Sequence, residues 1–307
     1  MYDLIIVGGG PAGIAAGVYA SRKRLKTLFI TRDWGGQSTD SLEIQNWIGT
    51  PAIAGTELAK KLREHLEAYA DGVVEIKDKA AVSRISKNDE GTFTVELAGG
   101  ESVDGKTVLI ATGSQRRKLP AVGADVFEHK GLTYCATCDG PLFAGQDVAV
   151  IGAGNAAFET AAQLLAYAKS VTLFQRGAAA KADPVTMEKV LAHPAMKRIE
   201  NAEVTEVYGN AFVSGLKYAH GGAVHDFPVS GIFVEIGMVP NTDLVNGLIT
   251  RDAYNRIEID PWTQRTSVPG IWAAGDCTNV RYHQNNISAG DAVKALEDIY
   301  MYVKTQQ

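Results

Sequence analysis

One glycine pattern occurs twice in this chain, each time between an apolar segment and a run of small residues. The copies are Gly8-Gly-Gly-Pro-Ala-Gly13 and Gly152-Ala-Gly-Asn-Ala-Ala157. In the pattern Gly-x-Gly-x-x-Gly/Ala, the first glycine permits a tight turn and the second lets the backbone approach a pyrophosphate. The third small residue lets the helix pack on its strand. Each copy therefore predicts a strand, a turn and a helix whose N-terminus holds the phosphates of a dinucleotide.

The candidate dinucleotide-binding residues are the defining positions of the pattern itself, namely Gly8, Gly10, Gly13, Gly152, Gly154 and Ala157. A further apolar segment follows each copy, at 27–30 and at 170–174. A strand, a helix and a second strand in this order are typical of a parallel βαβ unit.

Later segments indicate that the first of these domains is interrupted by the second. Residues 75–104 alternate between apolar and polar and contain glycine turns, which predicts an antiparallel meander. Strands are expected at 107–113 and 270–276, and a last helix is expected over about 289–303. The expected fold is α/β, with two Rossmann-like (three-layer ββα) dinucleotide-binding domains, the second inserted in the first. The expected bounds are 1–114 with 246–307, and 115–245.

Composition excludes several classes of function. The net charge of -5 argues against a nucleic-acid or anionic-membrane surface, because phosphate binding needs clustered Lys and Arg. No stretch approaches the roughly 18 apolar residues of a membrane span. The first apolar run, Leu4 to Val7, is too short for a signal peptide. We therefore expect a cytoplasmic protein without nucleic-acid or membrane partners.

The segment Cys135-Ala-Thr-Cys138 contains two of the three cysteines. In a reducing compartment, a Cys-x-x-Cys pair indicates redox or metal chemistry. A zinc site normally needs a second pair of Cys or His at similar spacing, and the remaining cysteine is the single Cys277. We therefore expect no metal, a redox dithiol that begins a helix, and a core or loop thiol at Cys277.

These motifs give the chain a family resemblance. It resembles the low-molecular-weight thioredoxin reductases, and it is even more similar to the reductase portion of the alkyl hydroperoxide reductase flavoprotein. The similarity extends from Tyr2 to about Leu296. Besides the first glycine pattern, the motifs that carry it are Gly35-Gly-Gln37, Ile110-Ala-Thr-Gly113, Cys135-Ala-Thr-Cys-Asp-Gly-Pro-Leu-Phe143, Gly231-Ile-Phe-Val-Glu-Ile-Gly-Met-Val-Pro-Asn241 and Ala274-Gly-Asp-Cys-Thr278.

The resemblance implies that residues 1–114 and 246–307 form an FAD-binding domain. Besides the first glycine pattern, the residues expected at this cofactor are Gly36, Gln37, Asn46, Thr112, Gly113, Asp276, His283 and Gln284. His283 stands where thioredoxin reductases usually have Arg, so the flavin edge is expected to differ. Asp33, at the end of the second strand, is either an acceptor for a ribose hydroxyl or a turn carboxylate.

The resemblance also assigns roles around the dithiol. Cys138 would lie next to the flavin and take its electrons, and Cys135 would attack the disulfide of a protein substrate. Asp139 would protonate the leaving thiolate, which requires it to lie within hydrogen-bond reach. The alternative role for Asp139 is that of a helix N-cap. The implied partner is thioredoxin or a thioredoxin-like protein, and the implied assembly is a homodimer.

The electron donor stays open between NADPH, NADH and reduced ferredoxin. NADPH-dependent relatives have His-Arg-Arg after the second strand of the inserted domain and a further Arg four residues on, whereas NADH-dependent relatives have an acid there. This chain has Gln175-Arg-Gly177 and, further on, Lys181. Arg176 and Lys181 are therefore the candidate contacts for a 2′-phosphate, although Lys does not replace a bidentate guanidinium.

Two other functions are alternatives, and the motifs favour the first of them over the second. A dithiol oxidase would use the same groups to oxidise a small-molecule dithiol, with oxygen as the acceptor. A non-catalytic flavin-binding partner or sensor would need neither Cys-x-x-Cys nor its neighbouring Asp139.

Overall fold

The computed structural model describes residues 1–41 and 43–305, and the side chains of Thr137 and Cys138 lie outside the described part. Contacts between residues divide the chain into two units, Met1–Gln115 with Val239–Gln307, and Arg116–Met238. The chain returns to unit 1 at Val239, before the expected residue 246. The physical reason is that Leu244 and Val245 are buried in the core of unit 1.

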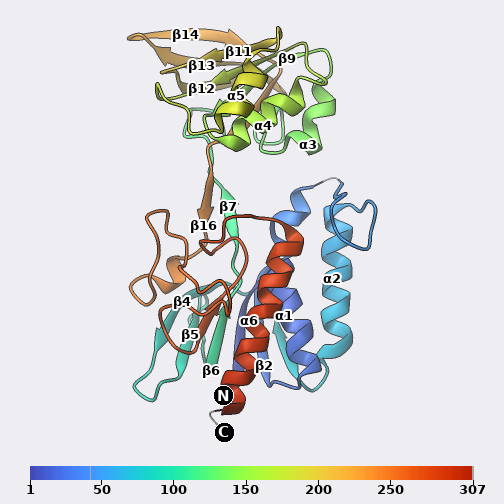
Figure 1. Cartoon of the computed structure of the whole chain (residues 1–307), viewed down its shortest axis with the longest axis vertical. Coiled ribbons are helices and arrows are strands. Elements are labelled where there is room, and N and C mark those ends of the chain that lie inside the picture. Colours follow the sequence, from blue (N-terminus) through green and yellow to red (C-terminus); the bar gives the residue numbers. More distant parts are fainter. Residues whose placement is uncertain (42, 306–307) are drawn as a thin grey trace. The chain divides into compact units, whose positions relative to one another are not determined.

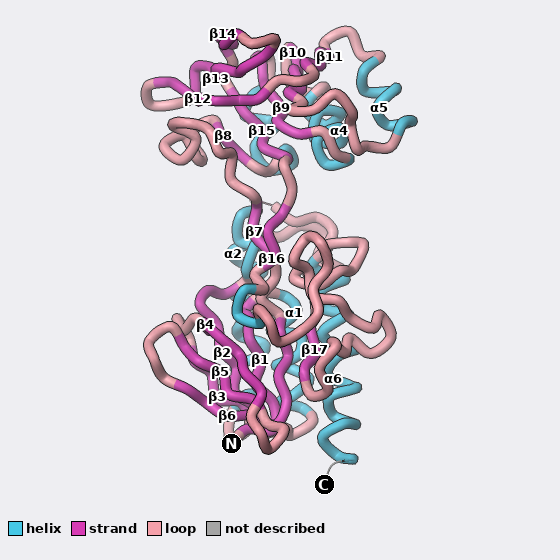
Figure 2. The backbone as a smooth tube through the Cα atoms, turned by 90° about the vertical axis from the view of Figure 1, so that its left-hand side faces the viewer, coloured by secondary structure: helices cyan, strands magenta, loops and turns pink. Residues whose placement is uncertain are grey.

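Unit 1 contains a parallel sheet of strands ordered β3-β2-β1-β6, to which β17 adds beside β6 (Figures 1 and 2). These strands are β1 (Tyr2–Gly9), β2 (Thr27–Trp34), β3 (Val74–Lys77), β6 (Ser102–Ile110) and β17 (Ile271–Ala273). Leu4, Ile5 and Ile6 are all fully buried, so both faces of β1 are covered. A continuous apolar run is the expected sequence of such a strand.

Helices cover one face of this sheet and a meander covers the other. The helices are α1 (Pro11–Arg22), α2 (Gly55–Ala70) and α6 (Asn285–Thr305), and Figure 1 shows the three on unit 1. The antiparallel strands β4 (Val82–Lys87) and β5 (Phe93–Leu97) continue from β6 and pack against the opposite face.

The meander is shorter than the sequence pattern predicted. Its first expected residues, Glu75 to Lys77, belong to β3, which pairs in parallel with β2. Alternation predicts a strand with one buried face but not the direction of its partner, which long-range packing decides. The last helix extends beyond the expected 289–303 at both ends.

Unit 2 repeats the architecture around a parallel sheet of order β11-β10-β9-β15-β8. Its strands are β8 (Leu132–Thr133), β9 (Asp147–Gly152), β10 (Ser170–Phe174), β11 (Met196–Ile199) and β15 (Gly231–Glu235). Helices α3 (Ala136–Asp139), α4 (Asn155–Leu164) and α5 (Pro184–Leu191) belong to one face. The antiparallel strands β12 (Glu203–Gly209), β13 (Val213–His220) and β14 (Ala223–Pro228) cover the other. The expected α/β fold with two Rossmann-like sheets is confirmed.

The chain passes between the units in two short strands, β7 (Ser114–Arg116) and β16 (Met238–Pro240), which pair with each other. Short 3-10 helices, η1 (Gly36–Asp40), η2 (Gly140–Phe143) and η3 (Asp243–Val245), complete the described elements. Within the described ranges, every helix is too short or too polar to cross a membrane.

Candidate active site

The first glycine pattern forms the turn between β1 and α1, and its glycines have different surroundings. Gly8 has a φ of 122°, and a Cβ there would lie 2.2 Å from the carbonyl oxygen of Ala111. A Cβ on Gly13 would lie 1.8 Å from the carbonyl oxygen of Gly8. A Cβ on Gly10 would meet nothing within 4 Å. Gly8 and Gly13 are therefore required for the close packing of the backbone, whereas Gly10 faces open space.

Two further motifs meet this turn at the N-terminus of α1. A Cβ on Gly36 would lie 3.6 Å from the Cα of Gly10, and one on Gly275 would lie 3.3 Å from the Cβ of Ala12. Pro11 follows the N-cap Gly10, and no side chain caps the helix. An open glycine at an uncapped helix N-terminus is a suitable cradle for a pyrophosphate, because N–H groups and the helix dipole both favour an anion.

Most of the residues expected along the flavin lie close to one another in unit 1. Asn46 donates from Nδ2 to Gln284 Oε1 at 2.9 Å, although 238 positions separate the two. Asp276 Oδ1 lies 3.3 Å from Nδ1 of His283 and accepts from Ser288 Oγ at 3.2 Å. His283 thus replaces the usual Arg with a side chain that pairs with Asp276.

Three expected residues have contacts to neighbouring backbone. Gln37 donates from Nε2 to the carbonyl oxygen of Ser114 at 2.8 Å, and Thr112 donates from Oγ1 to that of Asn241 at 2.7 Å. Gly113 has a φ of 63°, and its carbonyl oxygen accepts from the N–H of Asn241 at 3.0 Å. The three therefore join the end of β6 to the loops around it.

Asp33 lies near the end of β2 with an exposed side chain, and Arg32 donates from Nε to Asp33 Oδ2 at 2.7 Å. Asp33 is still part of the strand, so the expected alternative of a turn carboxylate is wrong. The role of an acceptor for a ribose hydroxyl is compatible with this exposed position.

The second glycine pattern has the same geometry in unit 2. Gly152 has a φ of 158°, with a Cβ position 2.4 Å from the carbonyl oxygen of Glu235, and Ala157 is fully buried. Gly154 is the N-cap of α4 and, like Gly10, would present a Cβ to open space. The backbone N–H of Lys181 donates to the carbonyl oxygen of Ala153 at 2.7 Å, which brings the loop after β10 beside this turn.

The loop after β10 carries exposed cations and a buried amide. Arg176 and Lys181 are both exposed. Gln175 is fully buried, and its Nε2 donates to the carbonyl oxygen of Gly177 at 2.8 Å. Its Oε1 has no hydrogen-bond partner within the described part of the chain. The two cations that were expected at a 2′-phosphate are therefore accessible from solvent.

Sequence reasoning missed Glu235, the last residue of β15. Thr160 of α4 donates to its Oε1 at 2.9 Å, and Arg116 lies 3.1 Å from its Oε2. Burial raises the pKa of the Glu235 carboxyl group, although Arg116 and Thr160 oppose that rise. An acid that directly follows four buried positions at the carboxyl end of a strand is the signal that would have indicated it.

The dithiol segment forms the short helix α3 and the turn that leads into it, between β8 and η2. Cys135 is disulfide-bonded and precedes α3, and Cys138, the expected flavin-side thiol, has its side chain outside the described part. The N–H of Asp139 donates to the carbonyl oxygen of Cys135 at 3.1 Å. Thr133 donates its hydroxyl to Asp139 Oδ2. The turn therefore fixes a carboxyl group next to the reactive segment.

A cavity of about 430 Å³ in unit 2 borders this turn. Thr133 and Asp139 line it together with apolar side chains, among which Leu142 and Phe212 are exposed. The Asp139 side chain is therefore accessible from an opening of mixed polar and apolar character.

Cys277 has no access to solvent. Its sulfur lies 3.6 Å from the carbonyl oxygen of Ile110 and 3.5 Å from that of Ala274. Burial raises the pKa of the thiol to about 11, so the nucleophilic thiolate is scarce at neutral pH. This environment agrees with the expected core thiol.

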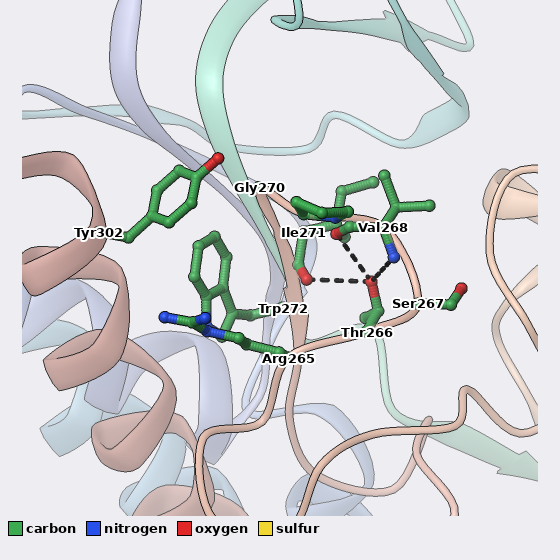
Figure 3. A pocket seen from close by; sticks show the side chains of 9 residues that line it. Arg265, Thr266, Ser267, Val268, Gly270, Ile271, Trp272 and Tyr302 are labelled. Carbon is green, nitrogen blue, oxygen red and sulfur yellow. Dashed lines mark hydrogen bonds between the residues drawn. The ribbon is translucent and has the colours of Figure 1, made fainter. Parts of the chain in front are cut away.

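A second, smaller cavity of about 110 Å³ lies in unit 1 beside Trp272 and Tyr302 (Figure 3). It contains none of the expected site residues. Thr266 accepts from Val268 N–H and donates within the loop, and Arg265 and Trp272 both donate to Asp298. These bonds join the 261–271 loop to α6, so the role of this region is structural.

Two dinucleotide-type glycine turns on Rossmann-like sheets, with an acid held beside a Cys-x-x-Cys turn, define the class of two-domain disulfide oxidoreductases. The model of the pyridine nucleotide-disulphide oxidoreductase family matches residues 2–292. The chain belongs to this family.

Relatives with different names match nearly the whole chain. A component of alkyl hydroperoxide reductase in Escherichia coli is 38% identical over 98% of this chain, which covers 58% of that protein. A protein named NADH dehydrogenase from Ferdinandcohnia aciditolerans is also 38% identical over 98% of the chain, which covers 57% of it. The chain thus spans less than two thirds of the length of these curated relatives.

Among solved structures, thioredoxin reductase from Streptococcus pyogenes aligns with a TM-score of 0.79 and 34% identity, over 99% of each chain. Thioredoxin reductase from Giardia duodenalis aligns with a TM-score of 0.80 and 28% identity, again over 99% of each chain. The resemblance to thioredoxin reductases that the motifs indicated is confirmed.

Proposed function

We propose that this chain transfers electrons through bound FAD to the Cys135–Cys138 pair, and from there to the disulfide of thioredoxin or a thioredoxin-like protein. The observation that carries the proposal is the turn at 133–139, in which Thr133 and the Cys135 carbonyl hold Asp139 beside the disulfide-bonded cysteine. A positioned acid is what disulfide reduction needs, because a departing thiolate must take up a proton.

Unit 1 is the proposed FAD domain. The Gly10 cradle would hold the pyrophosphate, and the Asn46–Gln284 and Asp276–His283 pairs would lie along the rest of the cofactor. When bound, FAD supplies a two-electron carrier between donor and disulfide. The chain's own contribution is to bind the cofactor at the helix N-terminus and to orient it through these amide and carboxylate groups.

Unit 2 is the proposed nicotinamide-type domain. The open Gly154 and the accessible Arg176 and Lys181 support NADPH as the donor, held more weakly than by a pair of arginines. The relative named NADH dehydrogenase keeps NADH as a candidate. Ferredoxin is the third candidate, in which case Gly152 is kept for packing and the open Gly154 holds no ligand.

The protein partner is proposed from the neighbours' names and from the cavity beside Asp139. Thioredoxin reductases are the structural neighbours, and the alkyl hydroperoxide reductase component is a sequence relative. The apolar Leu142 and Phe212 at the cavity present exposed surface for a protein to cover. We expect the working assembly to be a homodimer, which sedimentation of the holoprotein tests.

The test is steady-state turnover of the FAD-loaded protein with NADPH, NADH and reduced ferredoxin in parallel. Each donor is paired with thioredoxin under argon and, separately, with oxygen alone. The proposal predicts donor-dependent thioredoxin reduction that Cys135→Ser and Cys138→Ser abolish. Oxygen consumption with a small dithiol as the electron source, and no thioredoxin reduction, would instead establish a dithiol oxidase. If the protein shows no turnover with any donor, the function that remains is that of a non-catalytic flavin-binding partner or sensor.

A further inference from the structure

One buried hydroxyl contacts both groups on which the proposed chemistry depends. Thr133 is the last residue of β8 and is 5% exposed. The backbone N–H of Cys135 donates to Thr133 Oγ1 at 3.3 Å, and the Thr133 hydroxyl donates to Asp139 Oδ2. The parallel pairing of β8 with β15, in which Thr133 lies opposite Phe233, fixes its backbone in the sheet. The hydroxyl is therefore held by a rigid element and not by the turn itself.

The Thr133 hydroxyl accepts from one group and donates to the other. A backbone N–H only donates, so Thr133 Oγ1 is the acceptor toward Cys135, and its single hydrogen remains for Asp139. Asp139 Oδ2 receives the hydrogen of the Thr133 hydroxyl and is engaged by that bond. Oδ1 is therefore the oxygen of Asp139 that is free to deliver a proton.

We propose that Thr133 is a positioning residue for proton transfer, which orients Asp139 so that Oδ1 delivers the proton to the departing sulfur. This inference rests on the proposed dithiol function. A carboxyl group that rotates freely distributes its proton between two oxygens and many directions, whereas one held at Oδ2 presents Oδ1 in a fixed direction. The Cys135 contact joins the same hydroxyl to the residue whose thiolate attacks the substrate disulfide.

Bonds, protons and electrons balance in this step. The Cys135 thiolate bonds to one sulfur of the substrate disulfide, the substrate S–S bond breaks, and the departing sulfur takes the proton from Asp139 Oδ1. The Cys138 thiol then displaces the second substrate sulfur from Cys135, and its proton goes to that sulfur. The dithiol is oxidised to a disulfide, and the substrate disulfide is reduced to two thiols.

Rates measured with two different disulfides distinguish a loss of proton delivery from the other effects of a substitution, because only one of the two leaving thiolates needs a proton. The thiolate that leaves an alkyl disulfide, bis(2-hydroxyethyl) disulfide, is basic and needs the proton. The aromatic thiolate that leaves 5,5′-dithiobis(2-nitrobenzoate) is weakly basic and departs without one. The FAD-loaded protein, its dithiol reduced in advance by a phosphine, is mixed with each probe and the single-turnover rates are compared.

The variants are Thr133→Val, which keeps the shape but removes the hydroxyl, and Thr133→Ser, which keeps the hydroxyl. Thr205→Val is the matched control, because Thr205 of β12 donates only to the carbonyl oxygen of Lys217. We expect Thr133→Val to lower the single-turnover rate with the alkyl probe about tenfold. This loss is smaller than the whole rate enhancement that a general acid supplies. The aromatic probe should change less than about twofold, Thr133→Ser should restore the alkyl rate, and Thr205→Val should change neither.

Asp139→Asn gives the decisive comparison. In that background, Thr133→Val should cause no further loss on the alkyl probe, because the group that it positions is already gone. Equal losses on both probes, or losses that add to those of Asp139→Asn, would show a structural role and overturn the inference. Wild-type rates in Thr133→Val would overturn it as well, with the dithiol function intact. A wild-type dithiol that reduces neither probe would instead refute the proposed function itself.

Discussion

The glycines of the two turns divide into those that shape the backbone and those that leave room for a ligand. Gly8, Gly13 and Gly152 each face a backbone oxygen at a distance that no Cβ tolerates. Gly10 and Gly154 face open space, and neither is in the left-handed region of φ. Substitutions should therefore separate loss of fold from loss of cofactor.

We predict that Gly10→Val folds normally but binds FAD at least about tenfold more weakly, because its side chain would fill the pyrophosphate cradle. Gly13→Ala is the comparison, and it should lower the free energy of unfolding by about 2 kcal/mol through the clash with the Gly8 carbonyl. Flavin absorbance after gel filtration and thermal unfolding of the apoprotein measure the two effects. Gly10→Val that retains stoichiometric FAD would contradict this cofactor site.

Individual site residues could be predicted from the sequence where a local backbone pattern is enough to identify them. Both glycine turns and the Cys-x-x-Cys turn are local patterns that spacing alone makes recognisable, whereas the separate roles of the two cysteines were implied by the family resemblance. Thr133 and Glu235 were not predicted, since their partners Asp139, Thr160 and Arg116 come together only through the sheet and the packing of α4.

At the scale of elements, Glu235 joins three of them at the carboxyl end of the unit 2 sheet. It ends β15, accepts from Thr160 of α4 and pairs with Arg116 of β7. Because burial raises its pKa in the folded state, the folded protein retains this proton at pH values where the unfolded chain has lost it. The contribution of Glu235 to stability therefore falls as the pH rises from the pKa of this group in the unfolded chain to its pKa in the folded protein.

Glu235→Gln should consequently gain thermal stability relative to the wild type as pH rises from about 4 to about 8. The loss of the Arg116 pair offsets little of this gain, because the Arg116 side chain is 40% exposed. Melting temperatures of both proteins across this range, with the exposed Glu90→Gln as a surface control, provide the measurement. A difference that stays constant or shrinks with pH would show that the buried carboxylate is not destabilising.

The loop after β10 determines which nicotinamide fits unit 2. A Cβ on Gly177 would meet nothing within 4 Å, so Gly177→Arg should leave the fold intact. Together with Lys181→Arg, it should lower the KM for NADPH about tenfold, because each charge-assisted bond to a phosphate contributes roughly 1.5–3 kcal/mol. The KM for NADH should change little. If neither NADPH nor NADH reduces the double variant, unit 2 is not a nicotinamide site.

At the scale of the whole molecule, the division into two units follows the sequence except at the return crossing. The repeated glycine turn and the interrupted strand pattern predicted an inserted domain. The boundary near 246 was too late, since Leu244 and Val245 were assigned to the inserted domain but belong to the same buried core as Ile5 and Ile110. The burial of Leu244 and Val245 depends on the folded sheet, so no local sequence pattern predicts it.

The two crossings are proposed to work as a hinge. The dithiol belongs to unit 2 and the proposed FAD site to unit 1, so electrons must pass between units and then to a separate protein. Gly113 and Gly237, with φ of 63° and 96° and open space at their Cβ positions, lie at the ends of the crossing strands. A few such residues suffice to absorb a change of backbone angles.

A bifunctional cross-link that fixes unit 1 to unit 2 should slow thioredoxin reduction at least about tenfold, while chemical reduction of the flavin continues. The same reagent with one reactive end is the control. Full thioredoxin turnover in the cross-linked protein would exclude the hinge.

We propose that FAD and the Cys135–Cys138 pair exchange electrons within one chain, and an anaerobic reductive titration measures whether they do. Dithionite is added to the FAD-loaded wild type and to Cys135→Ser until the flavin absorbance is fully bleached. The wild type should take up about twice the reducing equivalents of the variant, because a disulfide is a two-electron couple like the flavin. Equal uptake by the two proteins, with the wild-type disulfide still intact when the flavin is bleached, would show that FAD does not pass electrons to the cysteine pair.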